Sequence, residues 1–445
     1  MNADRELLKR CFTAAIAAVD PAAVLQRQLC INAEAGVFRR GAHEWSLPLL
    51  ASDARGALRL IAIGKAAGPF ARAFCRVAIV HSGIVIAPAD APADVPGLLD
   101  VAADHPDPGA ASRYAALRLL QFIETGSATD RYVVLLTGGA SALCVLPIEG
   151  LDDCDKRQAV RVMMDAGATI AELNALRKHL SQLKGGRLGE RLSPASWLTF
   201  AISDVRDDDP AVIGSGPTVA DPTTFDDVLQ SIARLGIERQ LPPAVMRCLH
   251  DGVAGQLAET PKPGELRSMP YLVIASLDDA LEAAADFARQ QDLQVVSLGR
   301  TLYGQVETEA LRLQAEVRKA RASLSADSRA MLLLVGGEPI VQVRGEAAGG
   351  RAQHLALLLA RSLVDCPQVT VLAAGTDGID GRSSAAGGFA DCGSWSRIRN
   401  AGIDPAAALT AAASHSALAA AGDLFTTGRT ATNVADIVMI LIRAG

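Results

Sequence analysis

Short apolar runs, each followed by a glycine-rich or acidic turn and then by a helical stretch, recur along the first half of the chain. Apolar runs of about four to eight residues bounded by turn residues are typical of buried strands. A repeated order of strand, turn and helix predicts an α/β domain with a doubly wound, largely parallel, Rossmann-like sheet. The predicted strands are Leu58–Ile63, Ile84–Ala87, Tyr132–Leu136 and Leu198–Ile202.

Two further patterns in this half predict helices. Apolar residues between Leu7 and Val19 fall at helical spacing and Asp20-Pro21 ends the run, which indicates an amphipathic surface helix and not a targeting segment. Residues 155–192 are predicted as one long helical region. The sequence holds no apolar run long enough to cross a bilayer, so no membrane association is expected.

The composition changes between His250 and Pro270, and Thr260–Glu265, rich in proline and glycine, is the best candidate for a linker. We therefore expect two domains, residues 1–260 and 266–445, which fits a length of 445 residues. Leu332–Val335 and Ile340–Val343 are expected to form a β-hairpin, which would give the second α/β domain a mixed sheet. Its other predicted elements are Tyr271–Ala275, Asp278–Gln291, Gln294–Leu298, Glu307–Ser323, Val369–Ala373 and Ile437–Ile442.

Charge and cysteine content narrow the class of protein. The net charge of −6 argues against a nucleic-acid or membrane partner, although a local group of arginines and lysines could still bind a small anion. The eight cysteines are dispersed without metal-binding spacing, which favours buried thiols in a reducing, cytoplasmic setting. The oligomeric state is open, with a homodimer as one possibility.

The stretch Ala201–Pro222 carries the strongest chemical signal. A predicted strand is followed by Asp204, Asp207 and two further aspartates, and then by the glycine turn Gly214-Ser215-Gly216. Carboxylates at the carboxyl end of a strand can hold Mg²⁺, and glycines beside them let backbone N–H groups approach an anion. The pattern favours phosphate chemistry, and the alternative is a solvated acidic turn.

Other groups in this half are candidates for binding an anion. Gly64-Lys65 opens a helix after a strand, where a lysine can neutralise a phosphate, and Thr137–Ser141 supplies glycines after another strand. Arg177, Lys184 and Arg187 can share one helical face and bind a carboxylate or phosphate. The structural alternatives are a surface lysine, a closely packed turn and a solvated cationic face.

The second half adds three loops. Residues 345–351 end in Arg351 at the start of a predicted helix, where an arginine can stabilise a phosphoryl group in transfer. Gly375–Gly381 holds Asp377 and Asp380 among glycines, a pattern that suits a metal or ligand loop, and Thr426–Asn433 is a similar small-residue turn. The sequence contains no EF-hand, Walker A motif, nucleophile elbow or G-x-G-x-x-G dinucleotide fingerprint.

Taken in order, the motifs GKAA, TGGASAL, NALRKHLSQLKGGRL, ISDVRDDDPAVIGSGPTVADPTTF, VRGEAAGGR, AAGTDGIDGRSSAAGG and TGRTATN resemble the class II glycerate 2-kinase family from end to end. That family combines an N-terminal DUF4147 domain with a C-terminal MOFRL domain, and some members carry the older label hydroxypyruvate reductase. The resemblance implies two α/β domains with an active site in the cleft between them. It also implies Mg²⁺-dependent transfer of the γ-phosphoryl group of ATP to the 2-hydroxyl of D-glycerate.

The resemblance further implies roles for individual residues. Lys65 resembles the family's active-site lysine, Arg351 its second-domain arginine, and Asp204 and Asp377 the acids at the metal and the attacking hydroxyl. In the working hypothesis built on it, Asp204 or Asp207 holds Mg²⁺, and Arg177 or Lys184 binds the substrate carboxylate. The residues expected to contact the nucleotide are Gly138, Gly139, Ser141, Gly214, Ser215, Gly216, Thr376 and Asn433.

The chain departs from the family pattern at several positions. The commoner residues are a third glycine at Ala140, an amide at Ala352, a carboxylate at His354, and a proline and a glycine at Arg429 and Ala431. Losing a polar group aimed at a transition state lowers rates, so other functions stay open. They are a kinase of another small hydroxy or sugar acid, a ligand-binding paralogue with weakened catalysis, and the reductase of the older labels, which the missing dinucleotide fingerprint disfavours.

Overall fold

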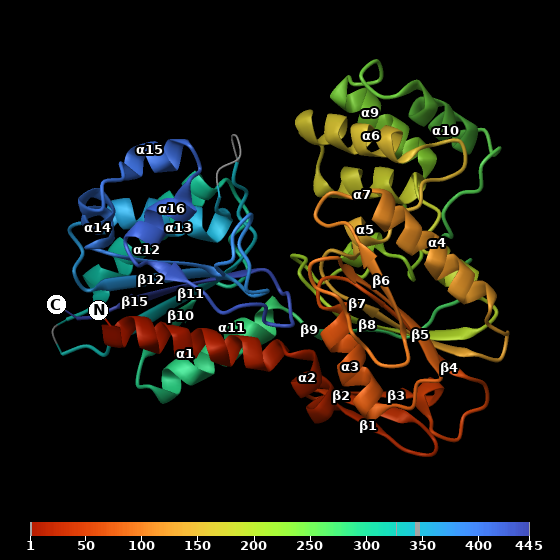
Figure 1. The fold of residues 1–445 in the computed structure, drawn as a ribbon, viewed down its shortest axis with the longest axis horizontal. Coiled ribbons are helices and arrows are strands. Elements are labelled where there is room, and N and C mark those ends of the chain that lie inside the picture. Colours follow the sequence, from red (N-terminus) through yellow and green to blue (C-terminus); the bar gives the residue numbers. More distant parts are fainter. Residues whose placement is uncertain (1, 326, 343–347, 445) are drawn as a thin grey trace. The chain divides into compact units, whose positions relative to one another are not determined.

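The computed structural model describes residues 2–325, 327–342 and 348–444, and the chain forms two compact units (Figure 1). The central unit is Val24–Ile274, and the composite unit combines Met1–Ala23 with Ala275–Gly445. The chain therefore passes between units twice, near residues 23 and 274, whereas the sequence suggested a single boundary at residues 261–265.

The first helix explains why the N-terminal residues group with the C-terminal half. Helix α1 (Asn2–Val19) packs along α11 (Leu277–Gln290) and against strands of the composite unit's sheet. Its apolar face, which includes Leu8 and Phe12, is fully buried. Burying each such side chain stabilises the folded protein by about 1.5–3 kcal/mol, which accounts for the packing of this helix on the composite unit.

The main sheet of the central unit has the strand order β6-β5-β4-β7-β8-β9. The pairs β6–β5, β5–β4, β4–β7 and β7–β8 are all parallel, which confirms the predicted doubly wound, largely parallel sheet. Strands β4 and β7 are adjacent at the point where the strand order reverses, and every residue of both is buried. The strands are β4 (Leu58–Ile63), β5 (Ser82–Pro88), β6 (Leu99–Ala103), β7 (Arg131–Leu136), β8 (Ser196–Ile202) and β9 (Tyr271–Ala275).

A small antiparallel sheet, which the sequence analysis did not anticipate, precedes the main sheet. It consists of β1 (Leu29–Ile31), β2 (Gly36–Arg40) and β3 (His43–Leu47), paired in that order. The helices of the central unit are α2 (Pro21–Gln28), which enters it from the composite unit, η1 (Pro48–Leu50), α3 (Ala67–Val77), α4 (Ala110–Glu124), α5 (Ala140–Leu143), α6 (Asp153–Asp165), α7 (Ile170–His179), α8 (Arg187–Leu192), η2 (Ile213–Ser215), α9 (Phe225–Leu235) and α10 (Pro243–Val253).

The helical region expected over residues 155–192 is divided into the three helices α6, α7 and α8. Gly167, Gly185 and Gly186 all have positive φ values, which a continuing helix does not permit. Helices α6, α7, α9 and α10 form a separate helical layer with its own apolar core, seen at the top of the central unit in Figure 1.

The composite unit has a mixed sheet with the order β10-β11-β15-β12-β13-β14. Strand β15 runs antiparallel to both β11 and β12, and the pairs β12–β13 and β13–β14 are also antiparallel. Helices α1 and α11 lie on one face of this sheet, and α12 and α13 lie on the other (Figure 1). The strands are β10 (Gln294–Ser297), β11 (Met331–Gly337), β12 (Val369–Gly375), β13 (Gly387–Asp391), β14 (Leu424–Phe425) and β15 (Asp436–Ile442), and the remaining helices are α12 (Val306–Ser323), α13 (Arg351–Ser362), α14 (Ser394–Asn400), α15 (Pro405–Thr410) and α16 (Ser414–Ala420).

The mixed sheet is confirmed, but the hairpin on which the expectation depended is wrong in the part that can be checked. Strand β11 pairs with β10 and β15, and Ile340 forms an isolated parallel bridge with Gln305. Gly337 has φ +145 and lies against the backbone of Leu302, so the chain continues towards the start of α12 and does not fold back on β11. Residue 343, the last of the expected second strand, lies outside the described residues.

Each unit brings several chain segments to one edge of its sheet. In the central unit the carboxyl ends of β4, β7 and β8 share an edge because these strands are parallel. In the composite unit the carboxyl ends of β11 and β12 flank the amino end of β15. Within the described parts of the chain, no helix is both long and apolar enough to span a membrane.

Candidate active site

The switch point of the central sheet holds the Gly64-Lys65 turn and the Thr137–Ser141 turn. The two turns are joined by hydrogen bonds from Lys65 N to Gly138 O at 2.8 Å and from Ala66 N to Thr137 Oγ1 at 3.1 Å. Ligands of open α/β sheets bind in the crevice at this point. The structure therefore brings together two predicted site segments that are about seventy residues apart in the sequence.

Glycine is required in both turns. Gly64 has φ +140, and a Cβ there would lie 2.0 Å from Thr137 Oγ1. Gly139 has φ +84, and its Cβ would lie 2.9 Å from His105 Nε2 and 3.2 Å from Lys65 Cγ. Since only glycine permits this approach, the half-buried side chain of Lys65 lies directly against the turn. His105, which sequence reasoning missed, also lies beside it.

The Gly214–Gly216 turn and the Lys184–Gly186 turn lie beside these two turns and are hydrogen-bonded to them or to each other. Ser141 Oγ lies 2.7 Å from Ser215 Oγ, in the glycine turn that follows the acidic loop. Gly185 N donates to Ser215 O at 3.0 Å, and Gly186 N donates to Gly216 O at 2.7 Å. The predicted nucleotide-contacting residues of the central unit, including Gly138, Gly139 and Gly214, are thus held in one network of small residues.

Lys184 is the buried cation of this network. Its Nζ donates to Ser141 O at 2.6 Å, and the side chain is almost completely buried. Burial, together with the positive charge of Arg177, lowers the pKa of Lys184 to about 7. Burial also lowers the pKa of Arg177. Among the described residues neither cation forms an ion pair with a carboxylate, so both are available to an anionic ligand.

The aspartates of the acidic loop that follows β8 differ in burial and in hydrogen bonding. Asp204 follows β8 and is half-buried at the sheet edge, whereas Asp207 is exposed. Asp209 Oδ1 accepts a hydrogen bond from Ala211 N at 2.8 Å, so this aspartate shapes the turn. In the described residues no three His, Cys, Asp or Glu side chains are arranged to hold a metal. Mg²⁺ needs only one or two carboxylates when phosphates complete its shell, so Asp204 suits a metal carried by a nucleotide and Asp207 is less well placed.

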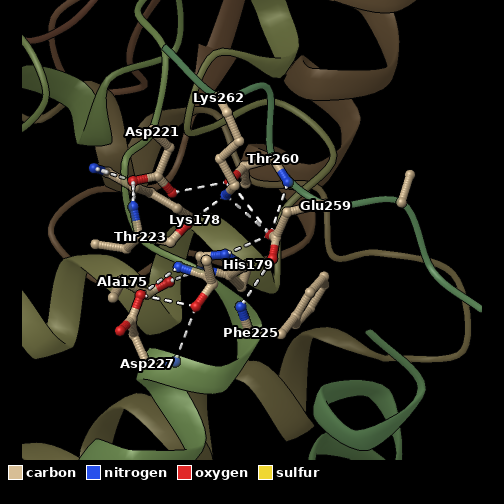
Figure 2. Close-up of polar contacts among 12 residues, drawn as sticks. Ala175, Lys178, His179, Asp221, Thr223, Phe225, Asp227, Glu259, Thr260 and Lys262 are labelled. Atoms are coloured by element: carbon tan, nitrogen blue, oxygen red, sulfur yellow. Dashed lines mark hydrogen bonds and ion pairs between the residues drawn. The ribbon is translucent and has the colours of Figure 1, made fainter. Parts of the chain in front are cut away.

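Figure 2 shows an ionic network that includes Lys178, His179, Asp221 and Glu259. It adjoins Gly185, where a Cβ would lie 3.1 Å from Lys178 Cβ and 3.2 Å from Asp221 Oδ2. Lys178 Nζ lies 3.1 Å from Asp221 Oδ1, and His179 Nε2 lies 2.7 Å from Glu259 Oε1. Burial disfavours the charge of Glu259, but the contacts with His179 and with Phe225 N outweigh burial and lower the pKa of Glu259 to about 2. His179 is fully buried, and its Nδ1 lies 2.8 Å from Ala175 O, so this side chain is held on both ring nitrogens as part of the network.

The edge of the composite sheet is organised around Arg351, the first residue of α13. Its Nε lies 2.7 Å from Asp436 Oδ2, and its Nη2 lies 2.6 Å from Glu338 Oε1. Asp436 begins β15 and is paired with Gly337 of β11 and Gly375 of β12. Burial opposes the charge of the guanidinium, but the two carboxylates raise the pKa of Arg351 above its ordinary value.

Asp380 positions Arg351 without contacting it. Its carboxylate accepts hydrogen bonds from Ala352 N at 3.1 Å and Gln353 N at 2.8 Å, which fixes the start of α13. A Cβ on Gly350 would lie 2.2 Å from Asp380 Oδ1, so glycine is needed there. Burial and the charge of Asp436 raise the pKa of Asp380 to about 7, against the lowering effect of these hydrogen bonds.

The Asp377 loop and the last turn of the chain are joined. Thr376 Oγ1 donates to Ala435 O at 2.6 Å and accepts from Val434 N at 2.9 Å. Asn433 is buried, and its Oδ1 accepts from Ala435 N at 3.4 Å. A Cβ on Gly375 would lie 3.3 Å from oxygens of both Asp377 and Asp436. Thr376, Asp377 and Asn433 are therefore brought to the same sheet edge as Arg351.

The residues that depart from the family pattern are accommodated by the fold. Ala140 starts α5 and is absent from the positive-φ positions, so its backbone does not need glycine. Ala352 is buried in the apolar core, and His354 is buried with Nδ1 3.0 Å from Ser414 Oγ. These two substitutions therefore change the packing of α13 and do not remove a side chain from the open sheet edge.

Ala431 is the exception, because its φ of +66 places an alanine in the left-handed region. That conformation costs roughly 1–2 kcal/mol for a residue with a Cβ. Ala431→Gly is expected to raise stability by about 0.5–1 kcal/mol after the larger entropy loss of glycine on folding, roughly 0.4–1 kcal/mol, is subtracted. Urea unfolding would measure the change. The matched control Ala407→Gly, at an exposed position inside α15, is expected to lower stability by about 1 kcal/mol. A destabilised Ala431→Gly protein would show that the strain is not significant.

Two α/β units that each gather glycine turns, cations and carboxylates at a sheet edge define a protein that binds phosphate-bearing or carboxylate ligands. A family model described as a domain of unknown function, DUF4147, matches residues 7–250, and the MOFRL family model matches residues 331–436. The D-glycerate 2-kinase of Thermotoga maritima is 32% identical over 411 residues, covering 91% of this chain and 95% of the relative. The glycerate 2-kinase of Pyrococcus horikoshii is 32% identical over 391 residues, covering 88% of each.

A protein of Agrobacterium vitis that is provisionally named a hydroxypyruvate reductase is 37% identical, covering 98% of this chain and 94% of the relative. The crystal structure of the glycerate kinase of Thermotoga maritima matches with a TM-score of 0.79 at 29% identity, covering 99% of this chain and all of that one. This chain belongs to the class II glycerate 2-kinase family, with its DUF4147 and MOFRL domains.

Proposed function

We propose that this protein is a glycerate 2-kinase, which converts ATP and D-glycerate into ADP and 2-phosphoglycerate. Membership of the family supports this activity, as do relatives that are named as glycerate 2-kinases. The observation on this chain that carries the proposal is the grouping of Lys65, the two glycine turns and the buried Lys184 at one switch point. The eight free cysteines suit a reducing cytoplasm, where we place the protein.

The Thr137–Ser141 turn is the proposed phosphate cradle. The N–H groups of Gly138 and Gly139 make no hydrogen bond within the described residues, and they precede the first turn of α5. Free N–H groups at such a turn favour a phosphate. Ser141, with Gly214, Ser215 and Gly216 beside it, would contact the same nucleotide, and Thr376 and Asn433 would supply contacts from the composite unit.

The transfer itself needs charge neutralisation and positioning more than covalent chemistry. The 2-hydroxyl oxygen forms a bond to the γ-phosphorus while the bond to the bridging oxygen of ADP breaks. Lys65 and Arg351 would stabilise the charge on the transferring group, and Asp377 would orient the hydroxyl and accept its proton.

We expect Mg²⁺ to bind together with the nucleotide. Asp204 would be its protein ligand, and Asp207 would be a second, more exposed carboxylate. The ion would supply positive charge against the phosphate oxygens. Because the described residues do not form a metal site by themselves, metal binding is expected to depend on the nucleotide.

Lys184 and Arg177 are proposed to bind the carboxylate of the substrate, which predicts a pH dependence. Lys184 has a pKa of about 7 without ligand, and an anion binds better to its charged form. The dissociation constant for D-glycerate is therefore expected to rise above pH 7, by at most about tenfold per pH unit, and to be nearly constant well below pH 7. Calorimetry between pH 6 and 9 would measure this change. Lys184→Met should bind more weakly at pH 6 and lose the dependence, whereas an unchanged slope in that variant would contradict the assignment.

Release of ADP from Mg²⁺-ATP, measured with D-glycerate and with a panel of three- to six-carbon hydroxy acids, tests the proposed function. Glycerate-dependent release supports it, and release with another acid alone would change the substrate but keep the kinase. No release with any acid, combined with oxidation of NADH or NADPH by hydroxypyruvate, would replace the proposal with the reductase activity.

A further inference from the structure

One buried lysine of the central unit takes no part in the site described above. Lys156 lies on α6 with only 5% of its surface exposed, and its Nζ is buried without a hydrogen-bond partner. Asn174, on the neighbouring helix α7, is also 5% exposed, and its Nδ2 is likewise buried and unpartnered. Buried polar groups are nearly always hydrogen-bonded, so two orphan donors on packed helices require an explanation.

The electrostatic surroundings of Lys156 are mostly positive. Lys184, Arg177 and Arg187 all act on it with like charge, and burial adds to their effect in lowering its pKa well below the ordinary value. Asp153 is the acid that acts on Lys156 in the opposite sense. Asp153 Oδ2 lies 3.6 Å from Arg113 Nη1, and Asp153 Oδ1 is buried without a hydrogen-bond partner. Within the described residues Asp153 forms no ion pair with Lys156, so its charge compensates Lys156 only from a distance.

Buried donors without a hydrogen-bond partner are costly in an empty protein. A buried cation without a partner loses its hydration, and nearby like charges add to the cost. A bound oxyanion would remove both penalties, because it accepts several hydrogen bonds and carries the missing negative charge. Helix α6, which carries Lys156, packs against α7, where Asn174 lies three residues before Arg177 and so on the same face. Lys184 and Arg177 also act on Lys156 electrostatically, so a single small anion near these helices would relieve the whole group.

We propose that Lys156 and Asn174, together with Arg177 and Lys184, form a site for one compact oxyanion, either the carboxylate of the hydroxy acid or a phosphate of the nucleotide. The proposal rests on the proposed function for the identity of these ligands. Lys156 and Asn174 form its buried side, and they extend the proposed substrate-binding group beyond Arg177 and Lys184.

The decisive variant is Lys156→Met, which keeps the length of the side chain and removes its charge. Calorimetry with D-glycerate, ADP and inorganic phosphate as separate probes is expected to show roughly 10- to 100-fold weaker binding of at least one of them. The melting temperature without ligand is expected to stay constant or to rise, because an uncompensated buried charge is removed. Arg157→Met is the matched control, since Arg157 is exposed on the same helix, and it should bind all three probes normally.

The probes separate the two sources of the anion. Weaker binding of glycerate alone assigns the site to the carboxylate, and weaker binding of ADP or phosphate assigns it to a phosphate. If Lys156→Met binds every probe as the unmodified protein does, or if the unmodified protein binds none of them, the proposal is overturned. A lower melting temperature with unchanged affinities would also overturn it, and would indicate a structural pairing of Lys156 with Asp153.

Asn174→Leu provides an independent second variant and should weaken the same probe as Lys156→Met. Binding is measured without turnover, so the result does not depend on the reaction. A protein that binds glycerate through Lys156 but releases no ADP would contradict the proposed function alone. A protein that phosphorylates glycerate with normal KM values for both D-glycerate and ATP after Lys156→Met would contradict the oxyanion site alone.

Discussion

Lys65→Ala is expected to lower kcat by on the order of 10³-fold while leaving the melting temperature nearly unchanged. Lys65 follows β4 at the switch point of the central sheet, with its backbone fixed by Gly138 O and its side chain against Gly139. Its ammonium group is proposed to stabilise the phosphoryl group during transfer. The substitution should therefore raise the free energy of the transition state more than it weakens substrate binding. Release of ADP with saturating Mg²⁺-ATP and D-glycerate measures the effect.

The matched control for this variant is Lys319→Ala, because Lys319 is exposed on α12 and remote in sequence from every candidate site residue. It should retain the full rate. If Lys65→Ala keeps kcat within about fivefold, less than the loss of a single transition-state contact, Lys65 does not stabilise the transition state. A rise in KM with a normal kcat would instead make Lys65 a residue for binding alone.

Arg351→Lys is expected to lower kcat by about 10²- to 10³-fold although it keeps the positive charge. The guanidinium contacts Asp436 through Nε and Glu338 through Nη2, and this two-sided arrangement fixes its direction at the sheet edge. A lysine offers one ammonium group and cannot hold both carboxylates in the same way. Steady-state kinetics with D-glycerate and ATP varied separately would show the loss mainly in kcat.

Arg361→Lys, an exposed position on the same helix α13, is the control and should be neutral. Because Asp436 is buried, Arg351→Met is expected to be much less stable than Arg351→Lys, by about 3–5 kcal/mol, since it leaves that carboxylate without its partner. Equal stability of the two variants would show that the ion pair does not hold the edge together. Full activity of Arg351→Lys would contradict the catalytic assignment.

The central sheet could be predicted from the sequence because its strands carry local signals. Leu58–Ile63 and Tyr132–Leu136 are continuous apolar runs, and each is followed by a glycine turn. The candidate site segments at the carboxyl ends of these strands could also be predicted, because parallel strands bring the turns that follow them to one edge of the sheet. Lys65, Ser141 and Lys184 were therefore within reach of sequence reasoning.

Features that depend on distant pairing were not predictable in this way. The last strand, β15, inserts between β11 and β12, so the apolar run at Met331–Gly337 finds its antiparallel partner about a hundred residues away instead of in a hairpin. Asp436 was missed for the same reason, because only that insertion places it beside Arg351. Lys156 gives no motif signal, since a single lysine in a charged helical segment is normally solvated.

The most direct test of the central claim is ³¹P NMR of the products formed from Mg²⁺-ATP and D-glycerate, recorded together with the release of ADP. The proposed reaction predicts one equivalent of 2-phosphoglycerate for each ADP, and no such product from the Lys65→Ala protein. Formation of ADP and free phosphate without phosphoglycerate, or a phosphate group on the 3-hydroxyl, would contradict the proposal.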